Sequence, residues 1–381
     1  MLEISIPSKN SDNNLKVTKN SFILFKKDLD QLLKLHNQGN FQLVVSSAYT
    51  LLEKYPDSFF VWNILGSALK SLGKFELASK AFNRVIQLNP NYADGFNNIG
   101  TILIQQGKIN EAIIAYKKAI FLNNNYVVAY VNFGNALRIA GKHNEAIKAF
   151  NKAVLIDPNY IDTYIKLGLS LLDQDKIDEA KELFKRVIAY DKENVLAHFN
   201  LGQALLKQNF LKEGLELYEW RWKLPQFFSQ RRNFSRPIWD GKVALNSKRL
   251  LLWSEQGIGD TLSWSSYLPI ISSKAHHCML ECQEKIVPLL QRSFPNIEVK
   301  PVNKELDSTR KDFDFHLPMG SLYKNLFQEI NKKNKTKSCL VPDANRVNYW
   351  KRRLRDVGKG SYIGISWKSS NMSSDRIQNY A

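Results

Sequence analysis

The chain has 381 residues, of which 44% are hydrophobic, and it carries a formal net charge of +18. This length and composition support more than one hydrophobic core, so we expect two or three domains and exclude a fibre or a disordered tail. Three cysteines are too few for a disulfide framework, and the sequence contains neither a signal-peptide run nor roughly 18 consecutive apolar residues. We therefore expect a cytoplasmic protein without a membrane span.

A repeat of constant period dominates the first half of the chain, and residues 1–24, which precede it, are expected to be disordered. Five units of the repeat have a glycine at the same position. Four of these units have an alanine twelve residues after the glycine, and all five have an aromatic residue sixteen residues after it. Small residues let two helices approach closely, and we expect the aromatic rings to fill the space between units. The register glycines are Gly66, Gly100, Gly134, Gly168 and Gly202, and the aromatics are Phe82, Tyr116, Phe150, Phe184 and Tyr218.

This pattern resembles the tetratricopeptide (TPR) family of stacked helix pairs, whose period of about 34 residues equals the step between these glycines. The resemblance covers residues 25–222 and implies an α-helical superhelix of about six repeats. The first unit has Leu32 in place of the register glycine. Such a divergent unit suits an N-terminal capping repeat, which needs no preceding neighbour. The array implies a protein or peptide partner bound along the first helices of the pairs.

An interrupted row of asparagines marks the expected binding face, two residues before the register glycines. Asn98, Asn132 and Asn200 occupy this position, and Ile64 and Lys166 replace asparagine in two other units. An asparagine amide both donates and accepts hydrogen bonds, so the row could hold the backbone of an extended peptide. It resembles the asparagine ladder of the O-GlcNAc transferase superhelix. The alternative is that asparagine is simply tolerated on a solvated helix face.

Residues 223–248 and the end of the last repeat are rich in aromatic and basic side chains. The segment is too apolar for a free linker, and we expect it to pack the last repeat against the next domain. The alternative is single-stranded nucleic-acid binding, in which bases stack on aromatic rings. The aromatic residues are Tyr218, Trp220, Trp222, Phe227, Phe228 and Trp239.

Most of the positive charge lies in the second half. Residues 221–381 contain 28 Lys and Arg against 14 Asp and Glu, a net charge of +14, which leaves +4 of the total for the part that precedes them. Such a field attracts nucleic acid, anionic membranes and phosphorylated ligands alike. Nucleic-acid binding is the least favoured of the functions considered.

Strand-like and helical segments alternate over residues 249–361, which predicts an α/β sheet of Rossmann type. The sequence predicts a strand at 249–254, a turn at Gly257 and Gly259, and a helix starting near Asp260. Further strands are expected at 276–281, 297–301, 313–317 and 362–367.

The segment LLLWSEQGIGDTLSWSSYLP at 250–269, with PIWDGK before it and FDFHLPMGSL after it, carries a second resemblance. It is similar to the glycosyltransferase domain that follows TPR arrays in many bacterial proteins, and to the heptosyltransferase group (glycosyltransferase family 9) with the GT-B fold. The resemblance implies that Asp260 is the general base on an acceptor hydroxyl. It also implies substrate-binding roles for Glu255, Gln256, Gly257 and Gly259.

Other interpretations of this loop stay open. The alternative role for Asp260 is that of a helix N-cap, which would stabilise the helix by about 1 kcal/mol. The two glycines alone are a weak nucleotide signal, because Leu262 stands where a third glycine would be needed. His276, His277, Cys278 and Cys282 have no matching ligand pair, so no metal site is expected.

The GT-B resemblance implies a nucleotide-sugar donor as co-substrate and no other cofactor. Trp367 and Lys368 match the start of the donor side, and only residues 362–381 follow the acceptor side. We therefore expect an incomplete or split enzyme, with a separate donor-side half as a possible partner. The leading hypothesis is a TPR-containing glycosyltransferase, and the alternative is a non-catalytic TPR interaction scaffold.

Overall fold

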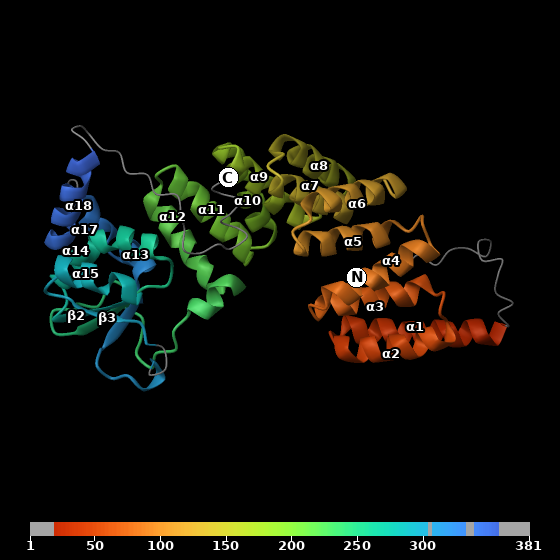
Figure 1. Ribbon diagram of the computed structural model, residues 1–381, viewed down its shortest axis with the longest axis horizontal. Coiled ribbons are helices and arrows are strands. Elements are labelled where there is room, and N and C mark those ends of the chain that lie inside the picture. Colours follow the sequence, from red (N-terminus) through yellow and green to blue (C-terminus); the bar gives the residue numbers. More distant parts are fainter. Residues whose placement is uncertain (1–18, 304–306, 333–338, 358–381) are drawn as a thin grey trace. The chain divides into compact units, whose positions relative to one another are not determined.

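The computed structural model describes residues 19–303, 307–332 and 339–357 (Figure 1). The expected strand at 362–367, with Trp367 and Lys368, lies outside the described residues. The chain divides into two compact units, residues 1–174 and residues 175–381. Each unit is described by itself below.

The first unit consists of consecutive antiparallel helix pairs, as the repeat in the sequence predicts. Its helices are α1 (Lys19–Asn37), α2 (Phe41–Lys54), α3 (Phe59–Ser71), α4 (Phe75–Leu88), α5 (Ala93–Gln105), α6 (Ile109–Leu122), α7 (Val127–Ile139), α8 (His143–Ile156) and α9 (Ile161–Asp173). The first helices α1, α3, α5, α7 and α9 contact one another in succession, and so form one row. Helix α1 begins at Lys19, so helical structure starts before residue 25, the expected boundary.

Three of the register glycines, Gly66, Gly100 and Gly134, face the aromatic ring of their own helix pair. A Cβ atom added at Gly66 would lie 2.7 Å from the ring of Phe82, and one added at Gly100 would lie 2.6 Å from the ring of Tyr116. The ring of Phe82 is fully buried. In these three pairs the ring occupies the place of the absent glycine side chain within its own pair, whereas at Gly202 that place is taken by Leu217.

A second glycine register, which we did not predict from the sequence, makes the turn inside each of the first four helix pairs. Gly39, Gly73, Gly107 and Gly141 recur at the same step as the first register, and their φ angles lie between +72° and +76°. This left-handed conformation lets the chain leave the first helix, and the N–H of Gly107 bonds to the carbonyl of Ile104 at 3.0 Å. Glycine adopts it without the steric penalty that a Cβ atom brings.

The second unit begins with α10 (Ile177–Tyr190), α11 (Val195–Lys207) and α12 (Leu211–Tyr218), followed by the 3₁₀ helices η1 (Glu219–Lys223) and η2 (Pro225–Gln230). At the position of the second glycine register it carries Asp175 and Asn209, with φ angles of 60° and 67°. Aspartate and asparagine tolerate this conformation better than other non-glycine residues.

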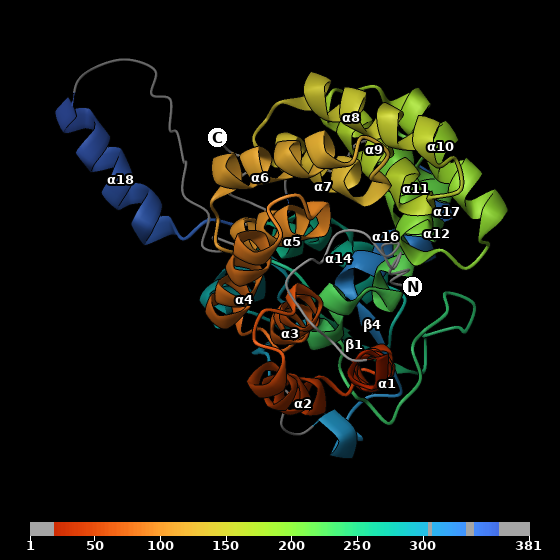
Figure 2. The ribbon, with the colours of Figure 1, turned by 90° about the vertical axis from the view of Figure 1, so that its right-hand side faces the viewer.

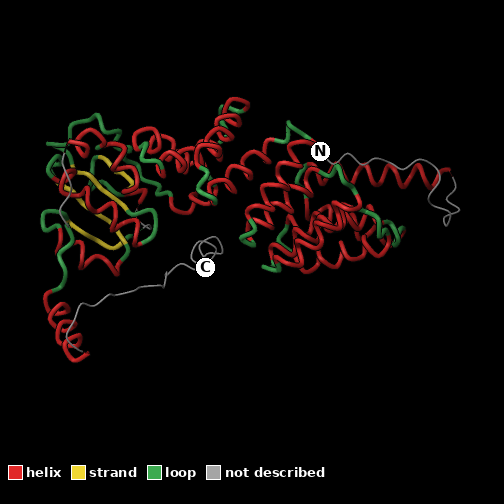
Figure 3. The backbone as a smooth tube through the Cα atoms, turned by 90° about the horizontal axis from the view of Figure 1, so that it is seen from above, coloured by secondary structure: helices red, strands yellow, loops and turns green. Residues whose placement is uncertain are grey.

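A four-stranded parallel sheet follows, built from β1 (Arg249–Trp253), β2 (His277–Cys282), β3 (Glu298–Pro301) and β4 (Phe315–Pro318) in the order β3-β2-β1-β4 (Figure 3). All four strands expected in the described residues are present. The last begins two residues later than expected. The helices between and after the strands include α13 (Ile258–Trp264), η3 (Ser265–Tyr267), α14 (Leu268–Ser272), η4 (Glu284–Ile286), α15 (Val287–Ser293), η5 (Asp307–Thr309), η6 (Met319–Ser321), α16 (Leu322–Asn325), α17 (Phe327–Lys332) and α18 (Ala344–Val357).

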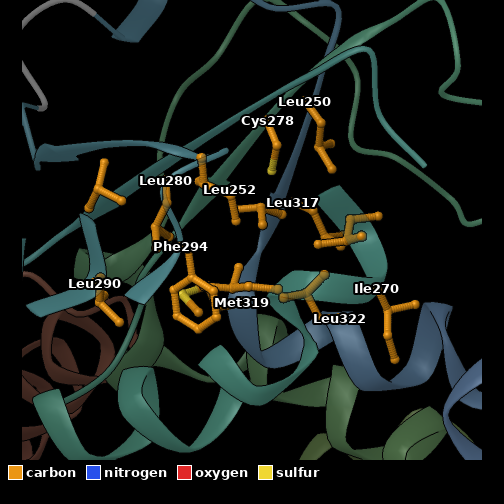
Figure 4. Packing of buried hydrophobic residues seen from close by; sticks show 14 of the residues in the cluster. Leu250, Leu252, Ile270, Cys278, Leu280, Leu290, Phe294, Leu317, Met319 and Leu322 are labelled. Atoms are coloured by element: carbon orange, nitrogen blue, oxygen red, sulfur yellow. The ribbon is translucent and has the colours of Figure 1, made fainter. Parts of the chain in front are cut away.

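Both faces of the sheet are covered, as is usual for parallel strands. On one face Leu250 and Leu252 pack with Ile270, Leu290 and Leu322, which come from α14, α15 and α16 (Figure 4). On the other face Leu251 and Met279 pack with Phe313 and with Phe234 of the junction segment. Helix α18 carries mainly exposed side chains and extends away from the sheet (Figure 2). No helix among the described residues is both long and apolar enough to cross a membrane.

Candidate functional site

The asparagine row of the first unit is bonded between successive repeats. The side-chain N–H of Asn98 donates to Oδ1 of Asn63 at 3.1 Å, and that of Asn132 donates to Oδ1 of Asn97 at 2.9 Å. Asn63 and Asn97 are buried, whereas Asn98 and Asn132 are partly buried. Beyond the expected peptide-binding row and its alternative of a merely solvated helix face, the structure uses the side-chain donors to join one helix pair to the next.

The same geometry explains where the row stops. The acceptor stands three residues before a register glycine and the donor two residues before the next one, so a bonded pair is 35 residues apart. Val131 and Ile165 occupy the acceptor position in later repeats, and the side chains at the matching donor positions are Lys166 and Asn200. In the second unit Asn200 is buried, with 4% of its surface exposed.

A row of tyrosines, which we did not predict from the sequence, stands at the start of three of the first helices. Tyr92, Tyr126 and Tyr160 recur at the repeat period and stand at the N-caps of α5, α7 and α9. The hydroxyl of Tyr126 donates to the carboxylate of Asp94, and that of Tyr92 accepts from Asn63 at 3.5 Å. Burial, followed by the negative charge of Asp94, raises the pKa of both Tyr92 and Tyr126 above the usual tyrosine value. Both tyrosines therefore stay neutral and can donate hydrogen bonds.

In the second unit a buried ion pair joins the end of the repeats to the loop after β1. Arg221 is fully buried, and its guanidinium donates to Glu255 at 3.0 Å and to Glu219 at 2.5 Å. The carboxylate of Glu255 also accepts from the backbone N–H of Gly320. Burial raises the pKa of Glu255 to about 7, although the charge of Arg221 acts in the opposite direction. We expected Glu255 to bind substrate. In the structure its carboxylate contacts Arg221 and the backbone of Gly320.

Gln256 belongs to the same joint. Its side-chain N–H donates to the hydroxyl of Tyr218 at 2.6 Å, and its backbone carbonyl accepts from the side-chain amide of Gln283 at 2.6 Å. The rings of Trp222 and Trp253 lie 5.8 Å apart. These contacts pack Tyr218 and Trp222, at the end of the repeats, against β1 and the loop that follows it.

The remaining junction aromatics divide into buried and exposed rings. Trp239 is buried, and its indole N–H donates to the carbonyl of Val243 at 2.8 Å. Trp220 stacks on His198 of α11 with ring centroids 3.9 Å apart. Phe228 differs from the expectation, because half of its surface is exposed.

Asp260 lies in the first turn of α13, which begins at Ile258 with Gly257 as its N-cap. Oδ2 of Asp260 accepts from the backbone N–H of Gly257 at 3.2 Å, the reverse half of a capping box. The residue therefore stabilises the helix start from the third helical position and not from the N-cap position itself. Gly257 has an ordinary φ of −68°, and a Cβ atom at Gly259 would meet nothing within 4 Å. The backbone at these positions does not require glycine.

The loops at the carboxyl ends of β1, β2 and β3 line an open pocket of about 380 Å³. Glu255, Gln256, Gln283 and Glu284 contribute to its lining. Cys282 also lines it, and burial raises the pKa of its thiol to about 12, so that it is protonated at neutral pH. No group of three or more potential metal ligands is found among the described residues.

Comparison with known proteins identifies the class of the repeats. Residues 66–107, 100–137 and 134–175 match a family model described as TPR repeat, and residues 165–219 match one described as tetratricopeptide repeat. Residues 66–219 are therefore tetratricopeptide repeats, as the period in the sequence predicts.

A curated relative is the protein FlbA of Caulobacter vibrioides, 27% identical over 161 residues. The match covers 38% of this chain and 26% of FlbA, so the chain spans about a quarter of that relative. Among solved structures, MamA is 24% identical with a TM-score of 0.38, over 44% of this chain and 92% of MamA. Pseudomonas aeruginosa PilF is 15% identical with a TM-score of 0.49, over 55% of this chain and 95% of PilF.

Proposed function

We propose that the chain is an interaction scaffold whose tetratricopeptide repeats bind a protein or peptide partner. The observation that carries this proposal is the row of first helices in the first unit, with Asn98 and Asn132 partly exposed along it. Their N–H groups are engaged by the preceding repeat, and no hydrogen bond to their Oδ1 atoms is found within the described part of the chain. Each asparagine is thus oriented by one bond and retains an acceptor.

An extended segment fits these acceptors. A peptide backbone presents N–H groups at regular intervals, and a fixed carbonyl can accept from one of them without selecting a side chain. Holding the amide in place beforehand reduces the entropy lost on binding. Near one end of the row the partly buried rings of Phe59 and Tyr92, 5.1 Å apart, offer an apolar contact for a partner side chain.

The test replaces the acceptors. Lys166 stands at the equivalent position of another repeat, so the helix pair accommodates lysine there. Because Asn98→Lys with Asn132→Lys also removes two bonds between repeats, circular dichroism must show that the double variant is folded at the temperature of the binding measurement. Peptides selected on the full chain from a random library would be measured by fluorescence anisotropy, and we expect the double variant to weaken binding roughly tenfold. The charge-matched control is Asn110→Lys with Asn151→Lys, at exposed positions on the second helices. Equal binding by wild type and the acceptor variant would refute binding along this row.

Sugar transfer from a nucleotide donor to a hydroxyl acceptor is the second candidate. It is favoured by the order β3-β2-β1-β4, because ligands of open α/β sheets bind beyond the carboxyl ends of the strands where the order reverses. In this proposal Asp260 would be the base, Gly257 and Gly259 would approach the substrate, and a separate donor-side half could complete the site.

Its test measures turnover of a panel of nucleotide sugars by the full chain, alone and with a donor-side half supplied in trans. Asp260→Asn should lower the rate about 10²- to 10⁴-fold, the usual contribution of a general base. An asparagine at this position still accepts from Gly257, so a rate loss without a change in melting temperature would separate catalysis from capping. An unchanged rate would leave Asp260 as a helix cap.

A further inference from the structure

Asp94 lies in the first turn of α5, one of the first helices of the repeats. The hydroxyl of Tyr126, from the next repeat, donates to its carboxylate and so holds the side chain in one orientation. Asn98, whose Oδ1 is a proposed acceptor for a bound peptide, stands four residues later and therefore on the same face of α5. Both residues are partly exposed. The first unit thus presents an oriented carboxylate beside the proposed peptide-binding row.

The negative charge of Asp94 is not balanced by a cation of its own unit. None of the ion pairs found within the described part of the first unit includes Asp94. Burial, and after it the charge of Asp94, raises the pKa of Tyr126, and no positive group contributes to that shift. A carboxylate that is partly shielded from water attracts a positive group more strongly than one in open solvent.

The equivalent carboxylate two repeats later shows which chemical group fits beside it. Asp162 of α9 pairs with Lys166 in the following turn, with 3.8 Å between Nζ and Oδ1. In the repeat of Asp94 the position of Lys166 is occupied by Asn98, which carries no charge. The chain therefore supplies a lysine to one carboxylate at this position of the repeat and none to the other.

Aromatic rings lie at the start of α5, where Tyr92 is the N-cap two residues before Asp94. The ring centroid of Tyr92 is 5.1 Å from that of Phe59 and 6.5 Å from that of Phe60, and all three residues are partly exposed. Such rings can contact the methylene groups of a lysine or arginine, and their faces attract its positive charge. A carboxylate with rings nearby therefore favours a long basic side chain.

We propose that Asp94 binds a lysine or arginine side chain of the partner peptide, with the rings of Phe59, Phe60 and Tyr92 in contact with its methylene groups. The inference rests on the proposed peptide binding by the repeats, and it adds the chemical class of the partner, a segment that carries a basic residue. Asn98 would then hold the peptide backbone, and Asp94, one turn away, would select a side chain.

The experiment selects peptides from a random library in parallel on the full chain and on its Asp94→Asn variant. We expect the wild type to enrich peptides with a lysine or arginine at one recurrent position, and the variant to lose this preference. An asparagine at this position can still accept from the hydroxyl of Tyr126, so the variant should remain folded, which circular dichroism checks.

Affinities of the best wild-type peptide then isolate the effect of charge. Replacing its basic residue by norleucine, which keeps the methylene groups but not the charge, should weaken binding to the wild type roughly tenfold in fluorescence anisotropy. Asp94→Asn should weaken binding of the unmodified peptide by a similar factor and leave the norleucine peptide nearly unaffected. The matched control is Glu111→Gln, which removes one negative charge from an exposed position of α6 and should bind like wild type.

Three results would overturn the inference while leaving peptide binding by the repeats in place. The selected peptides could lack a recurrent basic residue, the norleucine peptide could bind the wild type as tightly as the unmodified one, or Glu111→Gln could weaken binding as much as Asp94→Asn. The last result would indicate a general attraction between charges and no particular site. If neither protein selects any peptide, the proposed function fails and this inference fails with it.

Discussion

At single positions, glycine serves this chain in two ways: through its missing Cβ atom at Gly100, and through its backbone conformation at Gly107. Around Gly107 there is open space for a side chain, and only the φ of +74° opposes one. Gly100 has ordinary helical geometry, and the ring of Tyr116 occupies the place of its side chain. The two kinds of site therefore respond differently to the same substitution.

Gly107→Ala should destabilise the repeats by about 1–2 kcal/mol, the penalty for an L-residue in the left-handed region. The matched change Gly259→Ala lies in a helix, exposed and without neighbours, and should stabilise by up to about 1 kcal/mol. Urea unfolding of the full chain, followed by circular dichroism and by tryptophan fluorescence, measures both. Equal effects of the two alanines would show that backbone conformation is not what selects glycine at residue 107.

Gly100→Ala should destabilise by about 1–3 kcal/mol, because the new methyl group would overlap the Tyr116 ring in a packed core. Tyr116→Leu in the same chain should recover part of that loss by shortening the facing side chain. A double-mutant cycle measures this coupling. Strict additivity of the two changes would contradict the pairing of glycine and ring within one helix pair.

At the scale of the element, the repeat helices were predictable because their constant period is visible in the sequence itself. The hydrogen bonds that join successive repeats could not be predicted in this way. Each of them links residues 35 positions apart, one more than the repeat period, so a comparison of equivalent positions does not reveal them. The adjacent Asn97 and Asn98 carry the available signal: one accepts from the following repeat and the other donates to the preceding one. The polar row consequently contributes to stability as well as to the proposed binding.

Asn98→Ala should lower the free energy of unfolding by about 1–3 kcal/mol, because it leaves the buried carbonyl of Asn63 without its donor. Asn63→Ala should lower the free energy of unfolding less in the Asn98→Ala variant than in the wild type, because the hydrogen bond between the two residues is already lost. Asn110→Ala, exposed on α6, is the control and should have little effect. A wild-type melting curve for Asn98→Ala would show that the bond to Asn63 contributes no stability, as for an asparagine merely tolerated on a solvated helix face.

At the scale of the whole molecule, short apolar runs such as RLLLW predicted the four strands of the sheet. The sequence did not predict which residues the loops after these strands contact. The ion pair of Arg221 and Glu255 and the pocket at Gln230 and Ser254 depend on segments that meet only after folding. The assignment of Glu255 to substrate binding rested on its place in a loop motif, and the structure directs its carboxylate to Arg221 and Gly320. Local sequence shows where a loop begins, but not which way a carboxylate points.

The buried carboxyl of Glu255 gives the joint a predictable pH dependence. Its pKa is raised from 4.5 to about 7, so between these values the folded state holds a proton that the unfolded state has released. The contribution of this group to stability is thus fully present below the unfolded pKa and is lost as the pH rises through the folded one.

Glu255→Gln, which resembles the protonated form, should gain stability relative to wild type as the pH increases across this window. Melting temperatures of both proteins measure the difference, with Glu284→Gln, an exposed carboxylate of the same unit, as a control that should show no such trend. If the glutamine variant instead loses stability relative to wild type as the pH rises, the attraction of Arg221 outweighs burial, and the ionised pair is what holds the loop after β1 to the end of the repeats.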